Sequence, residues 1–123
     1  MADLTNNSAV RNSSATFTFD TCSASQTINA SATQDQRWVA IVRNENAAVA
    51  DQTATVTFAP SDVYMAGVVG TLSVDVGSGN DMKIVGPFES MRFKNSAGKI
   101  TVAVSCTLGG TATSVKIGTV LLP

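Results

Sequence analysis

Hydrophobic and polar residues alternate along much of this chain with a period of two, which is the side-chain period of a β-strand. In the run TATVTFAP, residues 53–60, Ala54, Val56 and Phe58 share one face, and threonines occupy the other. Similar runs predict further strands within residues 15–21, 23–31, 71–76, 81–85, 99–106 and 114–122. Only residues 61–67 have the character of a helical turn. The pattern therefore predicts an all-β protein.

The run RWVAIVRN differs from the others because it does not alternate. Residues 38–42 are continuously apolar, and an arginine stands on either side of them. A strand that is apolar on both sides suits the centre of a sheet whose two faces are both covered. We therefore expect residues 38–42 to form a central strand.

Turn residues rich in Gly, Asn and Pro separate the predicted strands at a spacing of roughly ten residues, as in sandwiches and jelly rolls. The chain of 123 residues fits one domain with one core. We predict a single antiparallel β-sandwich of about eight strands, immunoglobulin-like or jelly-roll in topology. The large residues expected to meet in its core are Trp38, Phe58, Leu72, Ile84, Val102 and Ile117.

The start of the chain differs in composition from the rest. Residues 1–14 contain one Leu and one Val among many Asn and Ser, which is too little apolar surface to offset the entropy of ordering. We therefore predict a flexible N-terminal arm at residues 1–14, ordered only against a partner, and a sandwich domain at residues 15–123. Because the start lacks the basic and apolar regions of a signal peptide, and no apolar run approaches ~20 residues, we expect synthesis in a cytoplasm and no membrane attachment.

Charge is scarce and evenly spread. Charged residues make up 14% of the chain, against about a quarter in an ordinary domain, and the net charge is −1. No basic stripe is present to neutralise phosphates, so the sequence does not predict nucleic-acid binding. A net charge so close to zero offers little electrostatic resistance to association between copies.

Residues that carry catalytic chemistry are few. The chain has no His, which removes the commonest general base and metal ligand, and two cysteines do not make a zinc site. Asp75, Asn80 and Asp81 supply oxygen ligands near a Gly-rich segment, but their spacing is not that of a calcium loop, and a hairpin turn explains them better. The sequence thus predicts no catalytic residue, no metal site and no cofactor, and we expect the protein not to be an enzyme.

Cys22 and Cys106 lie far apart with Trp38 between them, an order also found around the inter-sheet disulfide of immunoglobulin domains. Position 104, however, is Val instead of the tyrosine typical of that arrangement. A reducing cytoplasm favours free thiols, with Cys106 directed into the core, over a disulfide.

Two aromatic residues raise an alternative function. Trp38 and Tyr64 are candidates to stack on a sugar, as exposed aromatics do in carbohydrate-binding sandwiches. Trp38 lies in the most apolar run, where core packing accounts for it, and Tyr64 remains the more open candidate. A carbohydrate-binding module is therefore kept as the alternative from another class of protein.

The segment IVGPFESMRFKNSAGKITVAVS, residues 84–105, resembles a run found in small structural proteins of tailed bacteriophages. A strand ends in Gly-Pro-Phe-Glu, an Arg-Phe pair follows, and a short turn at residues 95–98 leads into an alternating strand. The matching residues before that turn are Ile84, Gly86, Pro87, Phe88, Glu89, Arg92 and Phe93. Residues 37–58 match more loosely, as a strand, a loop and a second strand.

The resemblance implies a β-rich, non-enzymatic virion component of the head-decoration or minor capsid type. Its partners would be the major capsid protein lattice, copies of itself, or both; the residues that bind them are not identified by the sequence. A tail or head–tail connector component is the alternative within virions. Phe88 and Phe93 are also expected to anchor a structural corner in the core, which is compatible with either role.

Overall fold

The computed structural model describes residues 3–4, 6–9, 13–29, 38–46, 52–60, 71–86, 93, 95–96, 98–107 and 110–121; the side chains of Asn6 and Trp38 lie outside this description. The strands are β1 (Asp3–Leu4), β2 (Asn6–Ser8), β3 (Asp20–Thr21), β4 (Ser25–Asn29), β5 (Trp38–Asn44), β6 (Ala54–Phe58), β7 (Leu72–Val76), β8 (Asp81–Val85), β9 (Lys99–Cys106) and β10 (Val115–Leu121). A single 3-10 turn, Ala112–Ser114, precedes β10 among the described residues.

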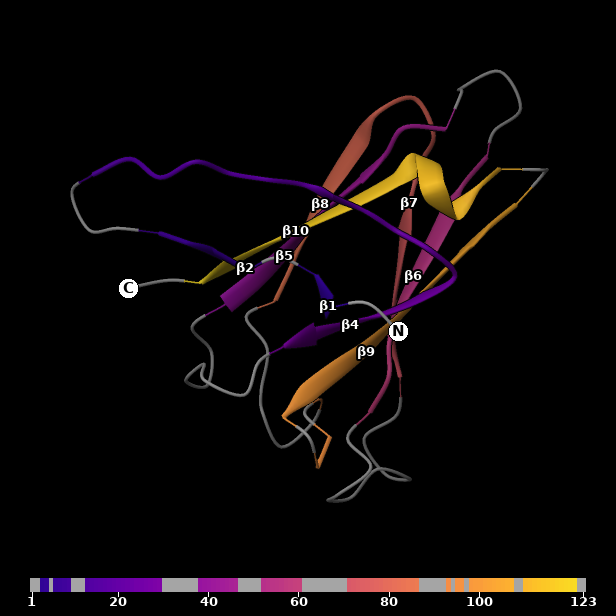
Figure 1. Cartoon of the computed structure of the whole chain (residues 1–123). Helices are drawn as coiled ribbons and strands as arrows, with labels where there is room; N and C mark the ends of the chain where they lie inside the picture. The colour runs from indigo at the N-terminus through magenta and orange to yellow at the C-terminus, as the bar shows by residue number, and fades with distance from the viewer. Residues whose placement is uncertain are drawn as a thin grey trace.

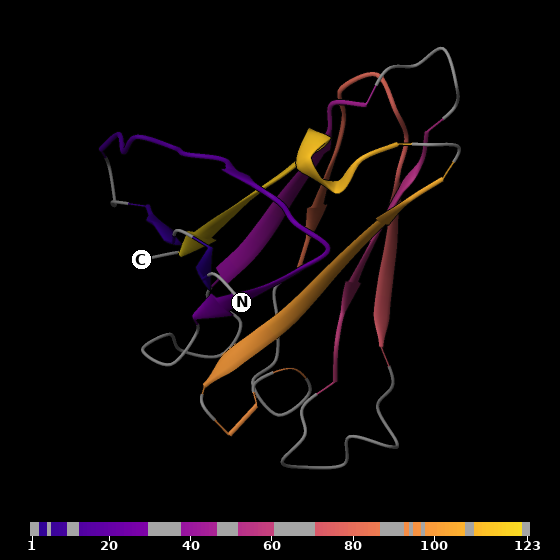
Figure 2. The same ribbon diagram turned by 45° about the vertical axis from the view of Figure 1, so that its right-hand side comes forward.

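These strands form two sheets that pack face to face, as Figures 1 and 2 show. The first sheet has the order β1-β4-β9-β6-β7, and the second has the order β2-β10-β5-β8, with β3 also paired to β10. Neighbouring described strands are antiparallel except in two pairs, β1 with β4 and β2 with β10, which are parallel. The predicted all-β sandwich is confirmed, with ten strands among the described residues in place of the expected eight or so.

The core lies between the sheets and contains the inward residues of both. Phe58, Val102 and Ile117 are fully buried, and Leu72 packs against the same cluster while partly exposed. The prediction for these four core residues is confirmed. Alternation is also confirmed in β9, where Ile100, Val102 and Val104 are buried and Cys106 packs against the cluster.

Ile84 is a correction to the predicted core, because its side chain is 72% exposed. In β8 the inward apolar residue is Val85, which pairs with the buried Ala40 of β5. Ile84 instead pairs with Ile41, which points to the opposite face. Adjacent residues of a strand face opposite sides, so the choice between Ile84 and Val85 depends on register and not on hydrophobicity.

The first residues also differ from the prediction, because parts of the expected arm belong to the sandwich. Asp3 and Leu4 pair with Thr27 and Ile28 of β4, and Leu4 is 7% exposed and joins the core. Residues 6–8 pair with residues 119–121 of β10. Backbone hydrogen bonds to ordered strands contribute the stabilisation that the scarce apolar surface of this segment does not provide. A boundary at residue 15 thus does not separate these residues from the sheets.

An asparagine network joins the sheets at the end of the sandwich where β5 stops. Asn44 is fully buried, and its side-chain amide donates to the carbonyls of Gln52 and Val76, 2.8 and 3.0 Å away. The Asn46 amide donates to Asn44 Oδ1 at 2.7 Å, and Asn46 Oδ1 accepts from the Thr111 N–H at 3.0 Å. The two buried amides therefore connect the segment before β6, the end of β7 and the segment before β10, and these hydrogen bonds replace the ones that the same groups would make to water.

The predicted turns around β8 and β9 are present. Gly79 and Asn80 have positive φ of 78° and 67° in the hairpin between β7 and β8, a conformation that Gly and Asn adopt most readily. Before β9, the Asn95 carbonyl accepts from the N–H of Gly98, and the Asn95 side chain accepts from the N–H of Lys99. Phe93 is 5% exposed, which confirms its role as a core anchor; Phe88 and the other residues from 87 to 92 lie outside the described residues.

Candidate interaction surface

The outer face of the second sheet is built from residues that alternate with its buried ones. In β5, Ala40 and Val42 are buried, so Val39, Ile41 and Arg43 face outward. The cross-strand pairs extend this face across the sheet: Gly118 and Ile84 flank Ile41, Lys116 and Met82 flank Arg43, and Val120 stands beside Val39. Gly118 has no side chain; of the seven outward side chains, four are aliphatic, and Met82 is a fifth large apolar one.

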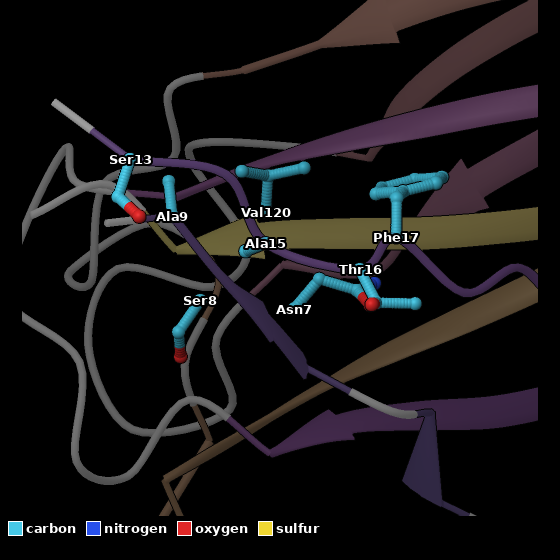
Figure 3. Close-up of a pocket in the computed structure, with 8 residues that line it drawn as sticks. All are labelled: Asn7, Ser8, Ala9, Ser13, Ala15, Thr16, Phe17 and Val120. Carbon is cyan, nitrogen blue, oxygen red and sulfur yellow. The ribbon is translucent and has the colours of Figure 1, made fainter. Parts of the chain in front are cut away.

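Phe17 covers part of this face. A Cβ on Gly118 would lie only 2.2 Å from Cζ of the Phe17 ring, so the ring rests directly on the glycine backbone of β10. In Figure 3 the side chains of Phe17 and Val120 project to the same side of β10. The absence of a side chain at position 118 is therefore what allows the aromatic ring to approach the sheet.

Asn7 of β2 holds this segment in place. Its side-chain amide donates to the carbonyls of Thr18 and Thr119, each at 3.0 Å, and its Oδ1 accepts from the Thr18 N–H at 2.9 Å. The amide thus satisfies both backbone groups of Thr18, as a neighbouring strand would. Residues 15–21 were predicted to be one strand; only Asp20–Thr21 is a strand, because Asn7 takes the place of a regular ladder beside Thr18.

The positive charges on this face are partly neutralised. Phe19 meets Phe17 edge-on, with ring centroids 4.7 Å apart, and the Arg43 guanidinium lies 4.7 Å from the centroid of Phe19. Arg43 also forms an ion pair with Glu45. The half of the face near β10 is therefore amphipathic, with two aromatic rings and a paired arginine, whereas the half nearer β8 is apolar.

The three large hydrophobic side chains most exposed among the described residues all lie on this one face: Phe17 at 38%, Met82 at 49% and Ile84 at 72%. We call Phe17, Val39, Ile41, Met82, Ile84 and Val120 the outer apolar face. Scattered exposed hydrophobic residues are ordinary, but a gathering on one side of one sheet is typical of a surface that contacts another protein.

A shallow pocket lies at the margin of this face and is shown in Figure 3. Its volume is about 160 Å³, and it is lined by Asn7, Ser8, Ala9, Ser13, Ala15, Thr16, Phe17 and Val120. No charged residue lines it, and small-molecule sites are usually larger, from about 300 Å³ upward. The pocket is better suited to receive one side chain of a partner than a metabolite.

The carboxylates of the described residues make separate contacts. Asp75 accepts a hydrogen bond from Thr55 on the outer face of the first sheet, and Asp81 accepts one from the Gly77 N–H within the hairpin. The hairpin interpretation of residues 75–81 therefore holds for the described geometry. Asp3 pairs with Lys99, and the hydrogen bond from Thr27, followed by that from Lys99, lowers the pKa of its carboxyl. Within the described parts of the chain, no three potential metal ligands come together.

The two thiols are free, as predicted, and both lie toward the core. Burial raises the pKa of Cys22 to about 12, and burial also raises the pKa of Cys106. Reactive cysteines have lowered pKa values, so neither thiol has the character of a nucleophile. The sugar-stacking candidates are not placed by the structure: Tyr64 and the Trp38 side chain lie outside the described residues. Among the described residues, no helix has the length and apolarity needed to cross a membrane.

Comparison of the chain with models of known protein families, with curated proteins and with solved structures found no significant match. The sequence signal for the outer apolar face was the unbroken apolar run at residues 38–42, which predicted cover on both sides of β5. That strand is central, between β10 and β8, as predicted. The sequence analysis did not predict that Met82 and Ile84 extend this face to the edge of the sheet, where both side chains are exposed.

Proposed function

We propose that the protein is a non-enzymatic structural component of a virion, specifically a decoration protein that binds and stabilises a lattice of major capsid proteins. The observation that carries the proposal is the outer apolar face, on which Phe17, Met82 and Ile84 are exposed together. The resemblance of residues 84–105 to structural proteins of tailed bacteriophages supplies the class of partner.

The mechanism would be adhesion. Met82 and Ile84 project from a rigid strand that is paired along its length with β5, so little order has to be gained when they are covered. A protein that binds only the assembled shell stabilises that shell by mass action, and many copies on a symmetric lattice multiply a weak individual contact. The small net charge of −1 keeps repulsion between adjacent copies low.

The experiment is co-sedimentation of the full chain with capsid shells assembled from the major capsid protein encoded in the same genome. Saturable binding, together with a higher melting temperature of the decorated shells, is the expected result. The matched variants are Ile84→Thr on the outer apolar face and Ser73→Ala on the outer face of the first sheet. The first should weaken binding and the second should not.

Binding to purified tails but not to shells would favour the tail or connector alternative. Retention on a polysaccharide column, with no affinity for virion components, would favour a carbohydrate-binding module. Equal binding by the wild type and Ile84→Thr would remove the outer apolar face from the mechanism.

A further inference from the structure

β8 ends the second sheet with an open edge. One side of the strand pairs with β5, and no described strand pairs with its other side. Asp81, Met82, Lys83 and Ile84 are all exposed, and no strand among the described residues covers this edge. An open edge presents unpaired N–H and C=O groups, which are a template for another strand.

Geometry restricts how two such edges can pair. In an antiparallel ladder, alternate residues direct both backbone groups to the same neighbour, and a residue directed to the open edge must face another of the same kind. A two-fold axis must therefore pass at a residue of β8 and not between two residues. The axes available near the centre of the strand are those at Asp81, Met82, Lys83 and Ile84.

Charge distinguishes these registers. An axis at Asp81 would place two aspartates opposite each other, and an axis at Lys83 would place two lysines opposite each other. An axis at Ile84 brings no opposite charges together. Only the axis at Met82 sets Asp81 of each copy against Lys83 of the other, so the sequence Asp-Met-Lys is complementary to itself.

We propose that two copies of the chain associate edge to edge through β8, in antiparallel register about Met82. Two Asp81–Lys83 pairs then flank a contact between the two Met82 side chains, with directly opposed Cβ atoms about 5 Å apart. Met82 and Ile84 of both copies lie on the same side of the joined sheet, so the two outer apolar faces become one continuous surface. The inference rests on β8 alone and does not require the proposed function.

The corresponding strand of the first sheet does not have this property. β7 is also an end strand, but Asp75 is its only charged residue, and no register supplies an opposite charge from β7 of a second copy. Because one strand pair buries much less than a standard interface of about 1,600 Å², the dimer should be reversible and visible only at high concentration. Crowding of copies on a lattice would provide that concentration.

The test is sedimentation velocity of the full chain and its variants across a concentration series from about micromolar to millimolar, the range expected for so small an interface. Asp81→Lys gives a strand with two positive charges, and Lys83→Asp gives one with two negative charges. Each variant alone should remain monomeric where the wild type dimerises, with the dimer weakened about tenfold or more. An equimolar mixture of the two should dimerise, because every opposed pair is then of opposite charge.

Asp75→Lys is the matched control, since it makes the same charge change on the other end strand. It should dimerise like the wild type, and it should not specifically pair with Lys83→Asp. A wild type that is monomeric throughout the series would overturn the proposal and would identify Lys83 as a guard against edge pairing. Dimerisation of the single variants, or no recovery in their mixture, would assign any dimer to a different surface. Thermal melts confirm that each variant is folded. If Asp81→Lys fails to fold, Asp81→Asn takes its place: mixed with Lys83→Asp it forms one Asp–Lys pair and no like-charge pair, so dimerisation of that mixture would still decide the register.

Discussion

The outer faces of the two sheets differ in chemistry, although the same alternation of side chains builds both. On the first sheet, Thr55 stands between Ser105 and Asp75, and Thr57 stands between Ala103 and Ser73. Thr55 donates a hydrogen bond to Asp75 at 2.8 Å. This face carries small polar groups that water or neighbouring hydroxyls satisfy, and it offers a partner little apolar area.

On the second sheet, the corresponding positions hold Ile41, Met82, Ile84, Val39 and Val120, and part of the face is covered by Phe17. A segment of the chain itself therefore shields the half near β10, while the half near β8 stays open. The outer face of the first sheet is therefore suited to contact with water. The outer face of the second sheet is suited to contact with protein: residues 13–20 of the same chain cover part of it, and in our proposal a partner covers the rest. The following predictions test the contrast.

The largest effect on stability is expected in the core, where both sheets present apolar side chains. Phe58→Ala removes a fully buried ring and should lower the free energy of unfolding by about 3–5 kcal/mol. Thr57→Ala, one residue away on the outer polar face, should change it by no more than about 0.5 kcal/mol. Urea unfolding of both variants measures the difference; similar losses would contradict the assignment of faces in β6.

The next effect concerns the first strands, which attach to both sheets. Leu4→Ala removes a core side chain at β1 and should cost about 2–5 kcal/mol. Deletion of residues 2–8 should lower the melting temperature further, because it also removes the Asn7 hydrogen bonds to the Thr18 backbone, next to Phe17 of the outer apolar face. A truncated protein that melts like the full chain would restore the sequence-based interpretation of a mobile arm.

A smaller loss is expected at the asparagine network. Asn46→Ala leaves the Thr111 N–H without its 3.0 Å acceptor and Asn44 Oδ1 without its 2.7 Å donor, which should cost about 1–3 kcal/mol. Ser23→Ala, which removes an exposed hydroxyl, is the control and should be nearly neutral. Chemical denaturation would again report the difference, and hydrogen exchange of the Thr111 amide should accelerate in the first variant.

Ile84→Thr should change stability by less than about 0.5 kcal/mol, since the side chain is 72% exposed. Its effect is expected on binding to the shell instead, as described above. A large loss of stability would show that Ile84 packs against the rest of the protein more extensively than its exposure indicates. Weaker binding by Ile84→Thr could then not be assigned to loss of a contact with the shell.

The smallest effect near neutral pH involves Cys22. Its pKa is raised to about 12 by burial, so the neutral thiol contributes stability that is fully present below the ordinary thiol pKa near 9.0 and is lost as the pH rises toward 12. At pH 8, Cys22 should resist iodoacetamide in the folded protein and react after denaturation. Two reactive thiols in denaturant without reductant are expected; none would reveal a disulfide.

The sequence by itself determined the fold class, because strict alternation in β6 and β9 allows only one choice of inward face. Ala54, Val56 and Phe58 on one strand and Ile100, Val102 and Val104 on the other are buried as that alternation requires. Turn residues determined the hairpin before β8 in the same local way, since Gly79 and Asn80 adopt a positive φ that few other residues tolerate.

Only the tertiary structure decided which apolar residues of β5 and β8 face outward. Both neighbours in Ile84-Val85 and in Ile41-Val42 are hydrophobic, so the inward choice came from the register that pairs Val85 with Ala40 and Ile84 with Ile41. The role of the first strands was likewise invisible to composition, because their order depends on pairing with residues about 25 and 110 positions away along the chain. Local pattern reports the period of a strand, whereas its partner and the side that meets the core are set by contacts between segments distant in the sequence.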